Sequence, residues 1–373
     1  MEYAKYKLGD IVTFLNGRAY LMPELQDSGK YRILRVGNLS GGNDSWYYSD
    51  MELDENKYCE KGDLLYAWAC NFGPHIWKEE KVIFHYHIWK LVEDKKKVDK
   101  TYLYYYLLHQ TPFYLGGVNG ATMVHITKKN MEKKTAYIPS SLEVQHRIAS
   151  ILSTYDTLIE NNTKRIRLLE KMAENLYKEW FVRFRFPGHE KVEMENGLPK
   201  GWSRGSLSEI CKFKRGKNIT SSEMIEGLVP VISAGLEPSG FHNEANVKGV
   251  SVTMSSSGAN AGYIAIHYSD IWAADCSYIE ESTTPYIYYV YELLNNIRGV
   301  ISNFQRGAAQ PHVYPKDINR IKMIIPSEDL RCLANERLSV IHKQIHNFEQ
   351  QNTLLARQRD LLLPRLMSGK LEV

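Results

Sequence analysis

The chain is 373 residues long, with 43% hydrophobic residues, 24% charged residues and a formal net charge of +4. This length predicts about two domains, and the ordinary composition excludes disordered and fibrous proteins. The mild basic excess is compatible with a polyanionic partner, although many proteins without a nucleic-acid role carry the same charge.

The sequence contains two copies of one unit. The segment LGDIVTFLNG, residues 8–17, matches LSEICKFKRG, residues 207–216, at its Leu, acidic, Ile, Phe and Gly positions. Further along, GATMVHITKKNM, residues 120–131, and GAAQPHVYPKDI, residues 307–318, share Gly-Ala, His and Lys at equivalent places. Internal repetition of this kind predicts two related structural units in succession.

The first part of each copy predicts a β-rich domain. The runs VIFHYHIWKL, residues 82–91, and GYIAIHYSDIW, residues 262–272, are aromatic and β-branched and are bounded by turn residues, as expected of strands. Short helices are predicted at residues 102–110 and 286–296. The 25 tyrosines suit such sheets, since tyrosine favours strands. We therefore expect an α+β fold class with two globular domains.

The second part of each copy predicts a long helix. Ser140 and Glu143 form a capping box after Pro139, and Ser327 begins the equivalent segment after Pro326. Apolar residues then recur with alternating spacings of three and four, which is typical of coiled coils. The predicted seam comprises Leu152, Tyr155, Ile159, Asn162, Ile166, Leu169, Ala173 and Leu176 in the first helix and Leu338, Ile341, Ile345, Phe348, Asn352, Leu355, Arg359 and Leu362 in the second.

We interpret the two helices as pairing with each other, whereas a single amphipathic helix usually packs on its own domain. Both seams include an asparagine, a residue type that fixes register in coiled coils. Each helix has about 30 residues and is roughly 45 Å long, so parallel pairing would force the linker, residues 187–201, to return over that distance. Antiparallel pairing avoids this path and would place one globular domain at each end, related by a pseudo-twofold axis.

Such a rod would hold two DNA-binding domains about one turn of the double helix apart, which is roughly 34–36 Å. Because the two copies differ widely in sequence, the expected target is bipartite and asymmetric. Base edges are read by donors and acceptors beside flat side chains, and phosphates are bound by Lys and Arg. The DNA-binding candidates of these types are Arg18, Trp68, Asn71, His75, Lys78, His125, Lys128 and Lys129 in the first copy, and Lys214, Arg215, Lys217, Asn218, Ser256, Asn260, Arg306, Gln310, His312 and Lys316 in the second. A solvated surface position is the alternative for each of them.

Known enzyme motifs are absent from the sequence. No two of the 13 prolines are adjacent, which excludes the Asn-Pro-Pro-Tyr and Asn-Pro-Pro-Phe motifs of adenine methyltransferases, and neither phosphate-binding glycine motif occurs. His342 and His346 share a helical face, but no intervening Glu completes a zinc-protease motif. We therefore expect no catalytic residues, no metal and no cofactor.

The five cysteines are scattered and never form Cys-x-x-Cys, so neither a disulfide framework nor a structural zinc site is indicated. The N-terminus MEYAKYKLGD lacks the apolar core of a secretion signal, and no run is long enough to span a bilayer. We expect a cytoplasmic protein without a membrane partner.

Several segments of the chain resemble type I restriction-modification specificity subunits. KGDLLYAWACNFGPHIW, residues 61–77, and SSSGANAGYIAIHYSDIWAADCSYIE, residues 255–280, look like two varieties of target recognition domain. Residues 145–188 are similar to the central conserved region of the family, and residues 355–373 are similar to its distal region. The resemblance covers nearly the whole chain.

The resemblance implies a non-catalytic subunit of a restriction-methyltransferase complex that reads double-stranded DNA. Two methyltransferase subunits would dock on the helical regions, and restriction subunits would join for cleavage. The expected divisions are target recognition domain 1 (1–139), a central helical spacer (140–186), a linker (187–201), target recognition domain 2 (202–326) and a C-terminal helical spacer (327–373). The second helix departs from a regular coil, since Arg359 occupies a seam position and Pro364 is expected to interrupt the last turn.

Two other function classes remain open. A coiled-coil adaptor with two protein-binding domains fits the same periodicity, but it would lack the salt-dependent duplex binding that phosphate contacts produce. An RNA-binding protein would prefer single-stranded loops to duplex DNA, which a competition experiment distinguishes.

Overall fold

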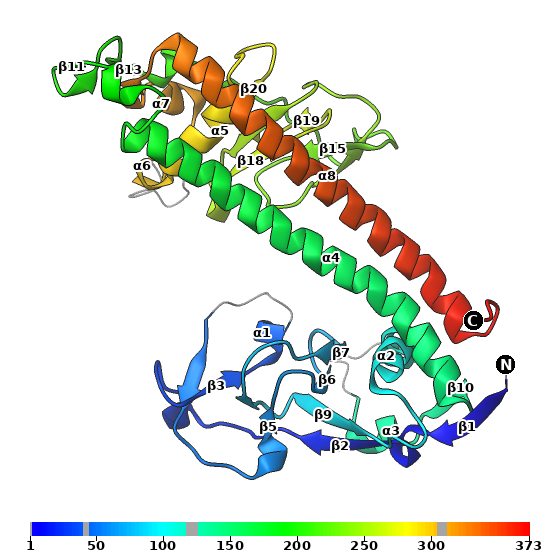
Figure 1. Cartoon of the computed structure of the whole chain (residues 1–373). Coiled ribbons are helices and arrows are strands. Elements are labelled where there is room, and N and C mark those ends of the chain that lie inside the picture. The colour runs from blue at the N-terminus through cyan, green and yellow to red at the C-terminus, as the bar shows by residue number, and fades with distance from the viewer. Residues whose placement is uncertain (1, 40–44, 117–125, 304–311) are drawn as a thin grey trace. The chain divides into compact units, whose positions relative to one another are not determined.

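The chain folds into two compact units (Figure 1). The computed structural model describes residues 2–39, 45–116, 126–303 and 312–373. Unit 1 comprises Met1–Glu160 and Thr353–Val373, and unit 2 comprises Asn161–Asn352. The domain boundaries expected from the sequence follow the helix ends instead, and they stay a prediction.

Unit 1 is built from short strands and few helices. Strand β1 (Tyr3–Lys7) pairs antiparallel with β10 (Thr135–Pro139). The sheet β2-β9-β6-β7 consists of Val12–Asn16, Ile88–Glu93, Leu64–Ala67 and Gly73–Ile76. The sheet β4-β3-β8-β5 consists of Tyr47–Ser49, Tyr31–Leu34, Val82–Phe84 and Tyr58–Cys59. The short helices are α1 (Val36–Leu39), α2 (Lys100–Leu115) and α3 (Lys128–Glu132), with 3-10 turns at Leu8–Asp10, Met22–Glu24 and Glu55–Lys57.

Unit 2 has a corresponding set of elements. Strand β13 (Ser203–Ser206) pairs antiparallel with β21 (Lys322–Ile325). The sheet β14-β20-β17-β18 consists of Lys214–Arg215, Cys276–Glu280, Ser251–Ser255 and Ile264–His267. The sheet β16-β15-β19 consists of Gly240–His242, Val229–Ile232 and Trp272–Ala273, and β11 (Met194–Glu195) pairs with β12 (Leu198–Pro199). The short helices are α5 (Ile287–Asn296), α6 (Arg298–Asn303) and α7 (Pro315–Asn319), with 3-10 turns at His189–Lys191, Leu207–Glu209 and Gly258–Asn260.

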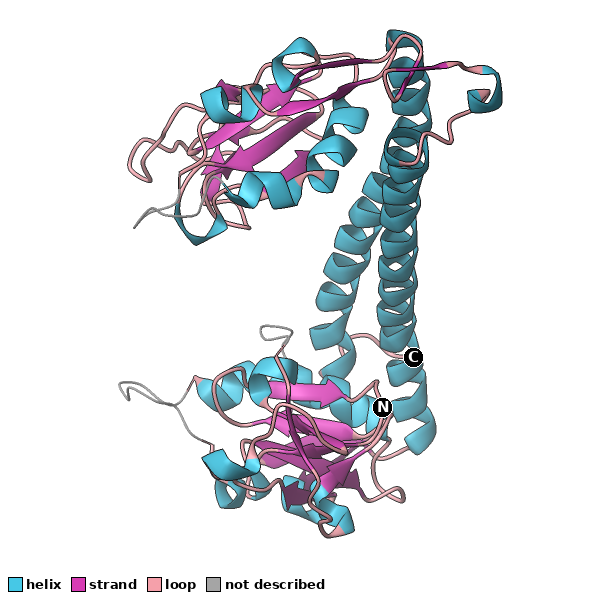
Figure 2. Ribbon diagram, turned by 90° about the vertical axis from the view of Figure 1, so that its left-hand side faces the viewer, coloured by secondary structure: helices cyan, strands magenta, loops and turns pink. Residues whose placement is uncertain are grey.

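The strand orders confirm the duplication that the sequence predicts. Each unit has a terminal antiparallel pair, a four-stranded antiparallel sheet and a second sheet that contains one parallel pair, β3 with β8 in unit 1 and β15 with β19 in unit 2. Figure 2 shows the strands of each unit gathered together, with short helices outside them. The predicted short helices are confirmed as α2 and α5. Each unit therefore combines helices and strands. The terminal pair and the four-stranded sheet have the same topology in both units.

The two runs interpreted as single strands are each divided by a turn. Within residues 82–91, β8 ends at Phe84 and β9 begins at Ile88. Strand β8 pairs with β3 in one sheet, whereas β9 pairs with β2 and β6 in the other. His85 and His87 therefore lie in the turn where the chain crosses from one sheet to the other, and not on a strand. Residues 262–272 are likewise divided between β18 and β19.

Aromatic side chains fill the core of unit 1. Trp89 is buried between Phe14, whose ring meets it edge-on at a centroid distance of 5.5 Å, and Tyr66, which stacks on it at 6.0 Å. The hydroxyl of Tyr66 is 3.0 Å from the hydroxyl of Thr111 on α2, so its polar end is satisfied inside the core. Sheet filling therefore explains several of the tyrosines. Among the described helices, none is long and apolar enough to cross a membrane.

Two long helices, α4 (Leu142–Tyr177) and α8 (Glu328–Met367), contribute residues to both units. A π-helical turn, Lys178–Val182, follows α4. The expected interruption at Pro364 is wrong, because α8 continues through this residue to Met367. Every predicted seam residue is buried or half-buried in the unit to which it belongs.

In unit 1, polar contacts attach the start of α4 to the domain. The buried side-chain amide of Gln145 accepts a hydrogen bond from the Asp99 amide at 2.8 Å and donates to the Pro139 carbonyl at 2.8 Å. About three turns further along α4, the Asp156 carboxylate accepts hydrogen bonds from Arg359 of α8 and from the Tyr105 hydroxyl of α2. Arg359 occupies a seam position because Asp156 lies opposite it to neutralise its charge.

In unit 2, contacts between α4 and α8 show that the helices run in opposite directions there. Asn162 donates to the Gln351 side chain at 3.3 Å, and the Arg165 guanidinium lies 5.5 Å from the centroid of the Phe348 ring. Residue numbers that rise along α4 therefore meet numbers that fall along α8. Asn352 donates to the hydroxyl of Thr163 at 3.4 Å, so both seam asparagines make contacts within this unit.

The glycine that ends the first repeated segment explains why that position is matched in both copies. A Cβ atom at Gly17 would lie 2.3 Å from the His85 carbonyl oxygen, and one at Gly216 would lie 2.3 Å from the Ala274 carbonyl oxygen. Real Cβ atoms do not approach backbone so closely, so each position needs glycine.

We predict that Gly17→Ala and Gly216→Ala each destabilise the protein by about 1–3 kcal/mol, the usual cost of overpacking, because the crossing strand must move. Gly299→Ala in α6 is the matched control, since its Cβ would meet open space and alanine favours a helix. Denaturant unfolding of the full chain measures the three changes. Equal losses of stability for the control and the two test variants would contradict this explanation.

Candidate nucleic-acid interface

Two of the predicted DNA-binding residues of unit 1, Arg18 and Trp68, meet at the turn between β8 and β9. The backbone of this turn is held by three other segments. The Arg18 amide donates to the Phe84 carbonyl at 3.0 Å, the His85 amide donates to the Leu34 carbonyl at 2.9 Å, and the Trp68 amide donates to the His87 carbonyl at 3.1 Å. Arg18 and Trp68, which lie 50 positions apart in the numbering, are thereby brought to one place.

A cation and flat aromatic rings lie side by side at this place. Arg18 donates to both Glu24 carboxylate oxygens, at 3.0 and 2.6 Å, and its guanidinium lies 5.2 Å from the centroid of the Tyr20 ring. The Trp68 indole nitrogen donates to the Tyr86 carbonyl at 2.8 Å, and its ring meets the His87 ring edge-on at 5.1 Å. Both predicted side chains are therefore fixed in position before any ligand is present.

Burial lowers the pKa values of two imidazoles of unit 1, which favours their neutral form. Burial, with smaller contributions from His87 and Arg35, lowers the pKa of His85 to about 4. Burial also lowers the pKa of His75 on β7. A neutral imidazole has one nitrogen that donates and one that accepts, so it is suited to the mixed edges of bases rather than to phosphates.

Unit 2 repeats this hydrogen-bond pattern with other side chains. The Lys217 amide donates to the Ala273 carbonyl at 2.9 Å, the Ala274 amide donates to the Ile232 carbonyl at 2.8 Å, and the Ser256 amide lies 3.4 Å from the Asp275 carbonyl. Lys217 thus corresponds to Arg18, and Ser256 corresponds to Trp68. Two of the predicted residues in each copy therefore occupy equivalent positions.

Charged side chains lie at the equivalent turn of unit 2. The Asp275 carboxylate pairs with the Arg215 guanidinium and accepts a hydrogen bond from the Ser257 hydroxyl. The Lys217 ammonium lies 5.8 Å from the centroid of the Trp272 ring, whose indole nitrogen donates to the Lys217 carbonyl at 2.8 Å. This arrangement presents cations next to an aromatic face, as in unit 1.

Other predicted residues of unit 1 lie apart from this hydrogen-bond pattern. Asn71 is exposed between β6 and β7. Lys78 pairs with Glu160 of α4. Lys128 and Lys129 lie on α3, where Lys128 is 3.7 Å from Glu132. His125 lies outside the described residues.

In unit 2, the predicted residues differ in exposure. Lys214 is 3.6 Å from Glu280, and Asn218 is exposed. His312 stacks on Tyr314 at a centroid distance of 5.7 Å, and the Lys316 ammonium lies 5.5 Å from the centroid of the same ring. Asn260 is half-buried in a 3-10 turn, whereas Ser256 is fully buried. Arg306 and Gln310 lie outside the described residues.

Sequence reasoning missed the residues at the centre of each cluster. Tyr20 contacts Arg18 and Tyr86 contacts Trp68 in unit 1. In unit 2, Asp275 and Tyr314 each contact two of the predicted residues. The sequence pattern alone does not single out these four residues. Their contacts come from separate segments, which local pattern cannot bring together.

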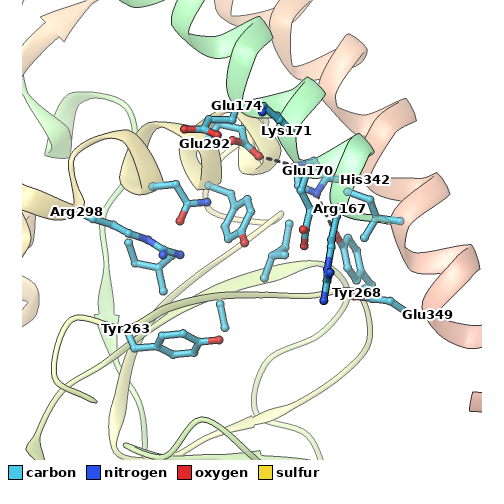
Figure 3. Close-up of a pocket in the computed structure, with 16 residues that line it drawn as sticks. Arg167, Glu170, Lys171, Glu174, Tyr263, Tyr268, Glu292, Arg298, His342 and Glu349 are labelled. Atoms are coloured by element: carbon cyan, nitrogen blue, oxygen red, sulfur yellow. Dashed lines mark hydrogen bonds and ion pairs between the residues drawn. The ribbon is translucent and has the colours of Figure 1, made fainter. Parts of the chain in front are cut away.

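A cavity of about 910 Å³ in unit 2 contains a buried His342 between α8, α5 and the loop after β18 (Figure 3). Its Nε2 is 3.1 Å from a carboxylate oxygen of Glu292, and its Nδ1 is 2.9 Å from the Tyr268 hydroxyl. A carboxylate only accepts, so we assign the Nε2 proton to the bond with Glu292 and let Nδ1 accept from Tyr268. Both ring nitrogens are occupied, so we interpret His342 as a link between α8 and the domain.

Carboxylates gather along the same cavity. Burial, reinforced by the Glu292 charge, raises the pKa of Glu170 on α4. Burial, reinforced by the Glu170 charge, raises the pKa of Glu349 on α8. His346 does not share the hydrogen-bond partners of His342, and its Nε2 lies 2.9 Å from the side-chain amide nitrogen of Gln350. Among the described residues, no group of three or more His, Cys, Asp or Glu side chains is placed to hold a metal ion.

Comparison with known proteins places both copies in one family. The model described as "Type I restriction modification DNA specificity domain" matches residues 1–171 and 199–359. The chain is 28% identical over 309 residues to the type I restriction enzyme MjaIX specificity subunit of Methanocaldococcus jannaschii, covering 75% of this chain and 71% of that protein. It is 25% identical to a putative type I specificity subunit of Mycoplasma pneumoniae, covering 98% and 96%. It shares its fold, at a TM-score of 0.65 and 20% identity, with the crystal structure of an S subunit from M. genitalium, covering 98% of this chain and 96% of that one.

We predict that His342→Phe destabilises the protein by about 3–5 kcal/mol, because the variant leaves the Glu292 carboxylate buried without its partner. Replacing both residues, as in His342→Phe with Glu292→Leu, should recover most of this loss, since an apolar pair of similar volume needs no partner. Denaturant unfolding of the single and double variants makes the comparison. A double variant no more stable than His342→Phe would show that this pair does not hold α8 to the domain.

Proposed function

The chain belongs to the type I restriction-modification DNA specificity family, and from this premise we propose that it reads a bipartite, asymmetric sequence in double-stranded DNA. The observation that carries the proposal is the equivalent placement of two unlike side-chain clusters. Arg18 and Trp68 in unit 1 occupy the backbone positions of Lys217 and Ser256 in unit 2. The same scaffold with different side chains would read two different half-sites.

The roles of the predicted residues follow from their chemistry. Exposed cations such as Lys217, Lys129 and Lys316 would bind phosphates and fix the position of each unit on the duplex. Side chains with base-reading donors and acceptors, such as Asn71, His75, Asn218 and His312, would contact base edges. The fully buried Ser256 would act by holding its loop, and not by touching a base. The remaining cationic candidates would likewise bind phosphates, and the remaining polar and aromatic candidates would likewise contact bases.

The long helices would set the distance between half-sites. We propose that α4 and α8 form an antiparallel coiled coil that separates target recognition domain 1 (1–139) from target recognition domain 2 (202–326), with a pseudo-twofold axis between the copies. Two observations support this proposal: the opposed contacts of α4 and α8 within unit 2, and the Asp156 to Arg359 pair within unit 1. The spacer between the half-sites would remain unread.

The partners follow from the family. The protein would dock two methyltransferase subunits on its helical regions, and restriction subunits would complete the assembly. It would supply no catalytic group itself, which agrees with the absence of the Asn-Pro-Pro-Tyr and Asn-Pro-Pro-Phe motifs from the sequence. The DNA of the cell lies in the cytoplasm of the organisms that carry such systems, and we place the protein there.

Methylome sequencing of cells with and without this protein tests the function. We predict a split methylated motif that disappears when the protein is deleted. The salt dependence of duplex binding distinguishes DNA reading from the adaptor alternative. Phosphate contacts release counterions, so the affinity of a DNA reader falls with salt, whereas a protein adaptor shows no such dependence. A methylome unchanged by the deletion would refute the proposal.

A second prediction concerns the spacer. Inserting four residues into each of α4 and α8, about one helical turn or roughly 6 Å, should lengthen the unread spacer by about two base pairs without changing either half-site. The same methylome measurement reads the outcome. Four residues inserted between Lys95 and Lys96, which are both exposed in the turn before α2, serve as the control and should leave the motif intact. A spacer of unchanged length in the helix variant would exclude the helices as the ruler.

A further inference from the structure

One short turn in each unit is hydrogen-bonded through its backbone to at least two other segments of the chain. In unit 1 this is the crossing turn, His85–Tyr86–His87, which receives or gives backbone hydrogen bonds to the segments of Arg18, Leu34 and Trp68. In unit 2 it is the two-residue turn Ala274–Asp275, bonded in the same way to the segments of Ile232 and Ser256. A turn held on several sides keeps its side chains in one geometry, which base reading requires.

Resting on the proposed function, we infer that this crossing turn determines specificity in both units, through Tyr86 of the turn itself in unit 1 and through the side chain that the turn residue Asp275 positions, Arg215 of β14, in unit 2. Tyr86 with its flanking imidazoles would read bases in one half-site, and Arg215 positioned by Asp275 would read bases in the other. The turn was not among the sites expected from the sequence.

In unit 1 the turn presents neutral groups beside flat rings. The Tyr86 side chain is 39% exposed, although its ring lies 3.9 Å from the His87 centroid and 4.4 Å from the His85 centroid. An exposed tyrosine held by neighbouring rings is a rigid surface for base contact, and its hydroxyl both donates and accepts. The imidazole of His85 is uncharged because burial lowers its pKa to about 4. This half of the protein would therefore read neutral donors, acceptors and the thymine methyl group.

In unit 2 the turn is one residue shorter and carries a charge. Asp275 takes the place of His87, because its carbonyl accepts from Ser256 as the His87 carbonyl accepts from Trp68. Its carboxylate pairs with Arg215 and accepts a hydrogen bond from Ser257, so one acidic side chain orients two others. The Arg215 side chain remains 40% exposed, with further N–H groups available for a ligand. Guanidinium groups fixed in this way bind guanine O6 and N7 in the major groove.

The test uses the full chain assembled with its methyltransferase subunits and a library of duplexes randomised in both half-sites. Tyr86→Ala should lower discrimination at one or more positions of one half-site by roughly tenfold to a hundredfold, with the other half-site unchanged. Arg215→Lys should lose preference for guanine in the opposite half-site by a similar factor, because a lysine cannot make the paired contact. Asp275→Asn should weaken that same position, as expected of a positioning residue.

Tyr137→Ala is the matched control, since Tyr137 lies on β10 of unit 1 and is 55% exposed. It should leave both half-sites as they are. Tyr86→Phe keeps the ring and tests the hydroxyl alone, so that a folding defect of Tyr86→Ala does not decide the result. Unchanged selectivity in Tyr86→Ala, Tyr86→Phe and Arg215→Lys, or an equal change in both half-sites, would overturn the inference. An unaltered protein that selects no sequence from the library would instead count against the proposed function.

Discussion

The backbone contact at which the chain crosses from one sheet to the other is the constraint on which each unit depends. At Gly17 and at Gly216 the chain passes so close to the crossing strand that no side chain fits. This approach allows the following residue, Arg18 or Lys217, to bond to the crossing strand. The loops that carry the candidate DNA contacts are therefore fixed by main-chain hydrogen bonds, and their side chains are free to differ between copies.

Different chemistry attaches the long helices to each unit. In unit 1, Gln145 and Asp156 of α4 make the polar contacts, and the acidic group lies on the long helix. In unit 2, the buried His342 of α8 bonds to Glu292 of α5, and the acidic group lies on the domain. The part of α4 in unit 1 and the part of α8 in unit 2 are thus attached to those units by hydrogen bonds of buried side chains. Partners of this kind are costly to separate, so they define which helix surface meets which domain.

The repeated backbone and the differing side chains together connect the fold with the proposed function. Repeated topology supplies two similar scaffolds, and unlike side chains supply two different surfaces. A neutral aromatic turn in unit 1 and a paired guanidinium and carboxylate in unit 2 occupy the same place in the repeat. The proposed reading of an asymmetric target would use this combination, because two half-sites of different sequence need surfaces of different chemistry.

The sequence alone determined the duplication, the α+β class, the short helices and the two long helices, because these depend on periodicity and on short matched segments. It also selected Arg18, Trp68, Lys217 and Arg215 by residue type. Only the tertiary structure decided that residues 82–91 contain a crossing, since the two parts pair with strands in different sheets. Likewise, only the fold paired Arg359 with Asp156, which lies about 200 positions earlier, because side chains so distant in sequence meet through packing that local pattern does not encode.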